Sequence, residues 1–243
     1  MEQLWFTALL NRFLGGPALS VLLALGIHPR HPEAPITNTV SMQILVVMLL
    51  TAAFLLLRSR LSVDQPGGLQ HLFEAVEGFV GNLGREIIGH GYERYVPFLV
   101  TLGLLILTCN LIGLIPGFES PTTSPVVPLG CAIVTWCYYH YHGVRTNGVV
   151  GYLKHFMGPV AWLAPGMFII EIFSHLARLL SLTVRLYANM FAGEQVTLVF
   201  FSLIPIGAPL AFEGLHVFVA LIQSYVFVLL ACVYLGEATA SDH

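Results

Sequence analysis

Ionisable and amide side chains recur along an apolar stretch of this 243-residue chain, residues 165 to 204. At about 100° per residue, these side chains fall close to one line on a helix. A charge at membrane depth is costly unless it faces a bundle interior or a watery cavity, so each is a candidate for a function. The line consists of Glu171, Ser174, Arg178, Leu182, Arg185 and Asn189, of which only Leu182 is apolar.

A second polar set accompanies the next apolar stretch, residues 210 to 235. His216 and Gln223 are seven residues apart and therefore share a helix face, with Glu213 nearby. Glu194 belongs to the first stretch but projects about 140° away from the line described above. It therefore faces a different neighbour.

An antiparallel pairing of the two stretches would bring the two sets to equal depths. Glu194 and His216 are almost equally far from Pro205, the predicted turn, and so are Arg185 and Gln223. We therefore expect two polar layers. Glu194 and His216 form the layer nearer the turn, and Arg185 and Gln223 form the deeper one.

These residue types suit proton transfer. Glutamate and histidine exchange protons, whereas arginine stays protonated at any working pH and cannot pass a proton on. Arg185 is therefore interpreted as a fixed barrier between two aqueous paths, one through Glu194 and His216 and the other through Glu171 and Ser174. A carboxylic acid on a moving partner would ionise more readily when it faces Arg185.

The composition requires a membrane around these residues. Hydrophobic residues make up 56% of the chain and charged residues 9%, whereas soluble domains carry about a quarter charged residues. The chain is therefore predicted to be a single all-α, polytopic membrane domain over residues 1 to 243. The net charge of −3 and the dispersed Lys and Arg residues argue against a nucleic-acid partner.

The domain divides into three parts. Residues 1 to 35 are predicted to lie in the membrane interface as an amphipathic helix with a turn at Gly15 to Pro17, unlike a signal peptide. Residues 36 to 158 hold the first spans and a surface helix, and residues 159 to 243 hold the polar hairpin. In the middle part, spans are predicted at 39–57, 95–115 and 126–141, and the cytoplasmic-side amphipathic helix at 69–94.

The stretch 165 to 204 is too long to stand upright in a membrane. At 1.5 Å per residue it would measure about 60 Å, twice the roughly 30 Å hydrocarbon layer. It must be steeply tilted or nearly horizontal, or else kinked near Gly193. The return helix 210 to 235, at about 39 Å, is also long.

Basic residues indicate the sidedness. Two lie in the N-terminal segment and none in residues 116–125, whereas four lie in residues 58–94 and two in 143–158. Because cytoplasmic loops carry the excess of Lys and Arg, the N-terminus is expected outside and the C-terminus in the cytoplasm.

No cofactor or metal site is expected. The cluster Tyr138 to His142 ends a predicted span, and we interpret it as an interfacial aromatic anchor in preference to a haem or metal site. The cysteines lie in apolar runs without CxxC spacing, which favours free thiols packed among helices. They are Cys109, Cys131, Cys137 and Cys232.

Three segments resemble subunit a of the F-type ATP synthase, the stator that touches a rotating ring of c subunits. They are YVPFLVTLGLLILTCNLIGLIPG at 95–117, RLYANMFAGE at 185–194 and FEGLHVFVALIQSYVFVLLACVYL at 212–235. The resemblance covers most of the chain after about residue 36. It implies two long helices lying almost horizontally against the ring, in a bacterial plasma (inner) membrane. It also implies peripheral-stalk b subunits as further partners, and protons as the transported ion.

The resemblance also implies roles for individual residues. Arg185 takes the place of the family's essential arginine. The outer half-channel residues are Asn189, Glu194, His216 and Gln223, and Glu171 and Ser174 are those near the inner half-channel.

Two positions depart from the family pattern, and two more residues have no implied role. Ala188 stands where many members have glycine, and Glu213 adds an acid one turn before His216. His175 and Arg178 have no assigned role. No GxxxxGK[ST] phosphate loop is present, so nucleotide binding and ATP chemistry belong to partner subunits.

Two other classes of function fit the sequence less well. An independent secondary transporter would use Arg185 to hold an anionic substrate, but the broken-helix repeats of such carriers are not evident in the sequence. A membrane enzyme would use Ser174 and His175, but adjacent helical residues point about 100° apart and do not form a nucleophile–base pair.

Overall fold

The computed structural model describes residues 4–29, 31–62, 65–115, 117–157, 164–203 and 208–240. These residues form seven α-helices and two short 3₁₀ helices, with no strand among them, which confirms the all-α prediction. The α-helices are α1 (Trp5–Ala24), α2 (Asn38–Ser59), α3 (Gly68–Ile87), α4 (Val96–Ile112), α5 (Val126–Met157), α6 (Ala164–Leu203) and α7 (Ala208–Thr239). The 3₁₀ helices are η1 (Tyr92–Arg94) and η2 (Pro121–Thr123).

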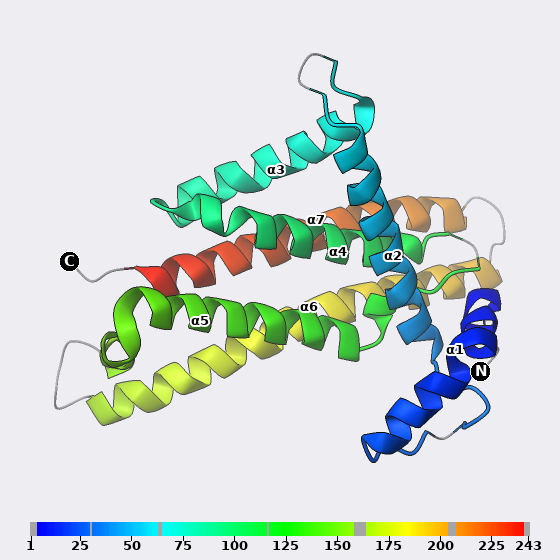
Figure 1. The fold of residues 1–243 in the computed structure, drawn as a ribbon, viewed down its shortest axis with the longest axis horizontal. Coiled ribbons are helices and arrows are strands. Elements are labelled where there is room, and N and C mark those ends of the chain that lie inside the picture. The colour runs from blue at the N-terminus through cyan, green and yellow to red at the C-terminus, as the bar shows by residue number, and fades with distance from the viewer. Residues whose placement is uncertain are drawn as a thin grey trace.

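Four of these helices are long and apolar enough to cross a membrane, by length and composition, namely α1, α2, α6 and α7. This agrees with a polytopic membrane protein. Helix α4 is also strongly apolar but has only 17 residues, fewer than the predicted span 95–115. Figure 1 shows α2 crossing the direction of α4 to α7, which lie side by side.

Helix α1 differs from its prediction. It continues through Gly15 and Pro17, so the turn predicted there is wrong. Contacts with the segment before α2 hold the helix in place. The Asn11 amide donates to the Ile36 carbonyl and accepts from the Ile36 N–H, both at 3.0 Å. Its position relative to a membrane interface stays a prediction.

Helix α3 is the expected surface helix, but it is shorter than predicted. Its acidic residues Glu74 and Glu77 are exposed, while Val80 packs into the core. The helix ends at Ile87 and not at residue 94, because Gly89 and Gly91 adopt φ values of 78° and 77°. Glycine enters this left-handed region without steric penalty, so the chain turns there toward α4.

Helix α5 runs past the predicted end of the third span. The helix passes through the aromatic cluster Tyr138 to His142, and its non-helical kink comes only at Gly148, where φ is 71° and ψ is 163°. Tyr139 is 1% exposed and belongs to the main core, whereas Tyr141 is openly exposed. The aromatic-anchor interpretation is therefore wrong for Tyr139, which packs between helices.

The polar hairpin is confirmed. Helix α6 has the predicted length, and α7 is longer than predicted. Helix α6 is continuous over 40 residues, about 60 Å, with no kink at Gly193. Helix α7 has 32 residues, about 48 Å, because it includes four residues after Leu235 that were predicted as a polar tail. Both helices exceed the roughly 30 Å hydrocarbon layer, so both must be strongly inclined.

Helices α5 and α7 approach closely at Gly143. A Cβ on Gly143 would lie 2.5 Å from the Tyr152 ring and 2.9 Å from the backbone oxygen of Ala238. We expect Gly143→Ala to lower the unfolding free energy by about 1–3 kcal/mol, because a backbone oxygen cannot move aside as a flexible side chain can. The matched control is Gly130→Ala on the same helix, where a Cβ meets nothing within 4 Å. Equal thermal stability of the two purified variants would contradict this packing.

Candidate ion-transfer site

Arg185 lies near the middle of α6, on the side of the helix that carries the predicted polar line. Its side chain is half-buried, and its Nη2 donates to Ser181 Oγ, 3.1 Å away and one turn earlier. Among the described residues no carboxylate lies within ion-pair distance of this guanidinium. Arg185 thus keeps most of its donors available in an apolar setting.

The deeper predicted layer forms with a different partner. Gln223 of α7 is 3% exposed, and its Oε1 accepts from Asn189 Nδ2 at 2.9 Å. The prediction that Gln223 pairs with Arg185 is therefore wrong by one helical turn. Because the Gln223 amide oxygen is bonded to Asn189, it does not pair with the guanidinium of Arg185.

The predicted pair of Glu194 and His216 does not form. The His216 ring lies over Gly193, where a Cβ would be only 3.3–3.5 Å from three of its ring atoms. Glu194 points elsewhere, toward the hydroxyl of Thr123 and the charge of Glu119 in the α4–α5 connection. The reason is local, because the missing side chain at Gly193 makes room for the imidazole, and the next residue points about 100° away.

A cavity of about 240 Å³ lies between α6 and α7 beside this imidazole. Asn189, Thr197 and His216 supply its polar lining. The His216 Nε2 is buried and has no hydrogen-bond partner among the described residues. Its remaining lining is apolar, so a water in this cavity finds its polar partners at Asn189, Thr197 and His216.

A second polar group lies toward the other end of the hairpin. Glu171 Oε1 lies 3.3 Å from His175 Nε2, and Ser174 is half-buried beside them in sequence. Arg178 Nη1 pairs with Glu237 Oε2 of α7 at 2.6 Å, and its guanidinium lies over the Tyr234 ring, 5.0 Å from the centroid. These contacts give partners to His175 and Arg178.

We call this second polar group the inner group. Three of its members were not predicted from the sequence. Glu237 falls in the predicted polar tail, Tyr139 in the predicted anchor, and Tyr234 in an apolar run. Helical spacing is the signal that could have found two of them. Tyr234 and Glu237 are three residues apart and therefore share the face of α7 that meets Arg178.

Buried apolar residues lie between the two polar groups along α6. Leu182 and Leu186 are at most 3% exposed and belong to the main core. They lie on the same helix as Arg185, whose charge is the single ionised group between Arg178 and Glu194 on α6. The arrangement provides two separate polar regions with a permanent positive charge between them.

In the described part of the chain, no group of three or more His, Cys, Asp or Glu side chains is arranged to hold a metal ion. The four cysteines are free thiols, as the sequence predicts.

Comparison with known proteins gives a consistent result. Residues 39–236 match the family model described as ATP synthase A chain. The chain is 61% identical over 242 residues to ATP synthase subunit a of Koribacter versatilis (strain Ellin345), covering 100% of this chain and 99% of that protein. It is 52% identical over 219 residues to ATP synthase subunit a of Solibacter usitatus (strain Ellin6076), covering 90% and 94%.

A more distant relative is ATP synthase subunit a 1 of Syntrophotalea carbinolica, which is 45% identical over 199 residues and covers 82% of this chain and 84% of that protein. The region that matches the family model includes α2 to α7 up to residue 236, and so both polar groups apart from Glu237. The chain belongs to the ATP synthase A chain family.

Proposed function

We propose that this chain is the proton-translocating stator subunit of an F-type ATP synthase, and that it supplies two offset half-channels to a rotating ring of c subunits. The observation that carries the proposal is the position of Arg185 between two separate polar groups on one continuous hairpin. The outer half-channel comprises Asn189, Glu194, His216 and Gln223. The inner half-channel comprises Glu171 and Ser174.

Each group has a defined task in this mechanism. A proton enters through the cavity at His216 and passes by way of Asn189 and Gln223 to a carboxylate on the ring. Rotation carries the neutral carboxylic acid through the lipid. On the other side it meets the inner group and releases the proton toward Glu171 and Ser174. The ionised carboxylate is then attracted by Arg185, which no proton can cross.

This chain translocates protons and does not act on ATP. ATP synthesis belongs to other subunits of the complex, and the chain itself is a non-catalytic membrane component. Its partners are the c-subunit ring, the peripheral-stalk b subunits and the surrounding lipid. No nucleotide or nucleic acid binds to it directly.

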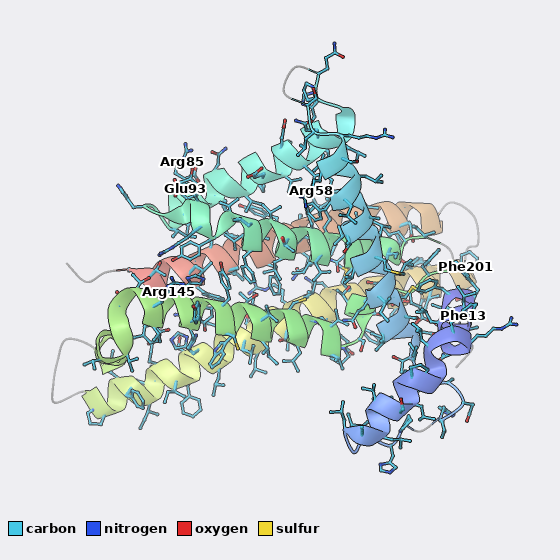
Figure 2. The ribbon with its side chains drawn as sticks, viewed as in Figure 1. Phe13, Arg58, Arg85, Glu93, Arg145 and Phe201 are labelled. Carbon is cyan, nitrogen blue, oxygen red and sulfur yellow. The ribbon has the colours of Figure 1, made fainter. Side chains whose placement is uncertain are left out.

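We place the chain in the bacterial plasma (inner) membrane, with the N-terminus outside and the C-terminus in the cytoplasm. Figure 2 shows Arg85 and Arg145 at one end of the molecule and Phe13 and Phe201 at the opposite end. The sidedness rests on the count of Lys and Arg along the sequence, which favours a cytoplasmic location for residues 58–94 and 143–158.

The alternative is an independent secondary transporter. Reconstitution separates the two functions. The purified chain alone in liposomes should conduct no protons under an imposed pH gradient, and conduction should appear when the c ring is reconstituted with it. Substrate-dependent transport by the chain alone would overturn the proposed function.

The contact between Asn189 and Gln223 gives a direct prediction. We expect Asn189→Leu and Gln223→Leu each to lower ATP-driven proton uptake roughly tenfold, because each leaves the partner amide without its hydrogen bond. The double variant should be no slower than the slower single variant, since the two side chains act as one unit. Multiplicative losses in the double variant would show that the two amides act separately.

A further inference from the structure

A buried histidine on α6 has no task in the function proposed above. His175 is 7% exposed, and both of its ring nitrogens have polar neighbours. Its Nδ1 lies 2.9 Å from the Tyr139 hydroxyl of α5, and its Nε2 lies 3.3 Å from Glu171 Oε1, one turn earlier on α6. The imidazole therefore bridges a buried phenol and a partly exposed carboxylate.

These two contacts select one form of the neutral ring. A phenol hydroxyl donates to an unprotonated imidazole nitrogen, so Tyr139 donates to Nδ1 and the ring proton stays on Nε2. That proton then points at the Glu171 carboxylate. At metal sites, a hydrogen-bond partner at one imidazole nitrogen likewise fixes the tautomer and the orientation of the imidazole whose other nitrogen binds the metal.

We propose that His175 and Tyr139 are positioning residues for Glu171, and that the charge of His175 gives proton exchange between Glu171 and the c ring its pH dependence. The inference rests on the proposed function, in which Glu171 receives the proton that leaves the c-subunit ring. Tyr139 is 1% exposed, so its hydroxyl holds the imidazole from the buried side. The pair acts by orienting Glu171.

Other titratable groups surround the imidazole on all three helices packed around it. Arg178 is paired with Glu237, and among the described residues Glu171 is the carboxylate within 4 Å of the imidazole. When the imidazole takes up a second proton, its positive charge attracts the Glu171 carboxylate oxygen 3.3 Å away and holds it in place. Tyr139 and His140 of α5 and Glu171 of α6 lie against the imidazole. Tyr152 of α5, Arg178 of α6, and Tyr234 and Glu237 of α7 act on Tyr139, its hydrogen-bond partner.

The test measures ATP-driven proton uptake by inverted vesicles that carry the assembled complex, from about pH 5 to 8, where imidazole changes its charge. Tyr139→Phe removes only the hydroxyl, and we expect a roughly tenfold slower rate with a shifted pH profile. His175→Gln keeps hydrogen-bonding groups but cannot titrate, so its pH profile should be flatter. Ser224→Ala is the control, because it also removes a buried hydroxyl, one that donates to a backbone carbonyl on α7.

Matched assembly is checked by blot, and either variant that assembles decides the outcome. Rates and pH profiles that coincide with those of Ser224→Ala would overturn the positioning role. Arg185→Ala, measured in parallel, separates this inference from the function beneath it. If Arg185→Ala still pumps, the proposed function fails. If it does not pump while Tyr139→Phe and His175→Gln match the control, only the positioning role fails.

Discussion

Arg185→Ala is expected to abolish ATP-driven proton uptake while the complex still assembles. The guanidinium is the one permanent charge between the two polar groups on α6, and it donates to the hydroxyl of Ser181, on its own helix. Removing it should therefore disturb little of the packing between helices. The ring carboxylate then loses the charge that favours its ionised form, and protons lose the barrier between the two half-channels.

The matched control is Arg145→Ala. Arg145 is on α5 (Figure 2). Its guanidinium donates to the Tyr141 hydroxyl at 3.4 Å. Loss of this surface contact should change proton uptake less than about twofold, as expected for an exposed weak interaction. Coupled pumping by Arg185→Ala at a rate near that of Arg145→Ala would show that the arginine is not the barrier.

The second large effect is expected at the outer half-channel. His216→Leu should lower proton uptake about 100-fold or more, because it removes the titratable group that lines the cavity between α6 and α7. Glu194→Leu should have a similar effect, since the carboxylate next to Thr123 can exchange protons and leucine cannot. The measurement is proton uptake in vesicles with matched amounts of assembled complex.

Glu77→Leu is the control for these changes. Glu77 is an exposed acid on α3, outside the hairpin that carries both polar groups. Its loss should leave pumping nearly unchanged. Activity of His216→Leu comparable to that of Glu77→Leu would exclude the cavity as a proton path.

Much of the fold follows from the sequence because apolar length and turn residues are local signals. The hairpin, the break at residues 66–68 and the start of α2 all agree with the predicted positions. The failures come from tertiary contacts. Pro17 lies inside α1, whose Asn11 is bonded to Ile36, and α5 continues through an aromatic cluster that packs against α6.

The positions of the candidate side chains along each helix follow from the sequence, but their contacts do not. Spacing along one helix places Arg185, Asn189 and Glu194 correctly relative to one another, since helical geometry is regular. Spacing cannot give the register between two helices to better than about one turn, and Gln223 is therefore paired with Asn189 and not with Arg185. The contact between Tyr139 and His175 joins residues 36 apart, and no periodic pattern indicates it.

The core of the proposed mechanism is a pair of half-channels, one on each side of Arg185. They open to opposite sides of the membrane. Thiol accessibility tests them most directly, in a complex whose four native cysteines are replaced by alanine. A membrane-impermeant thiol reagent should label Thr197→Cys only from the outside and Ser174→Cys only from the cytoplasmic side. Labelling of both positions from the same side would contradict the mechanism.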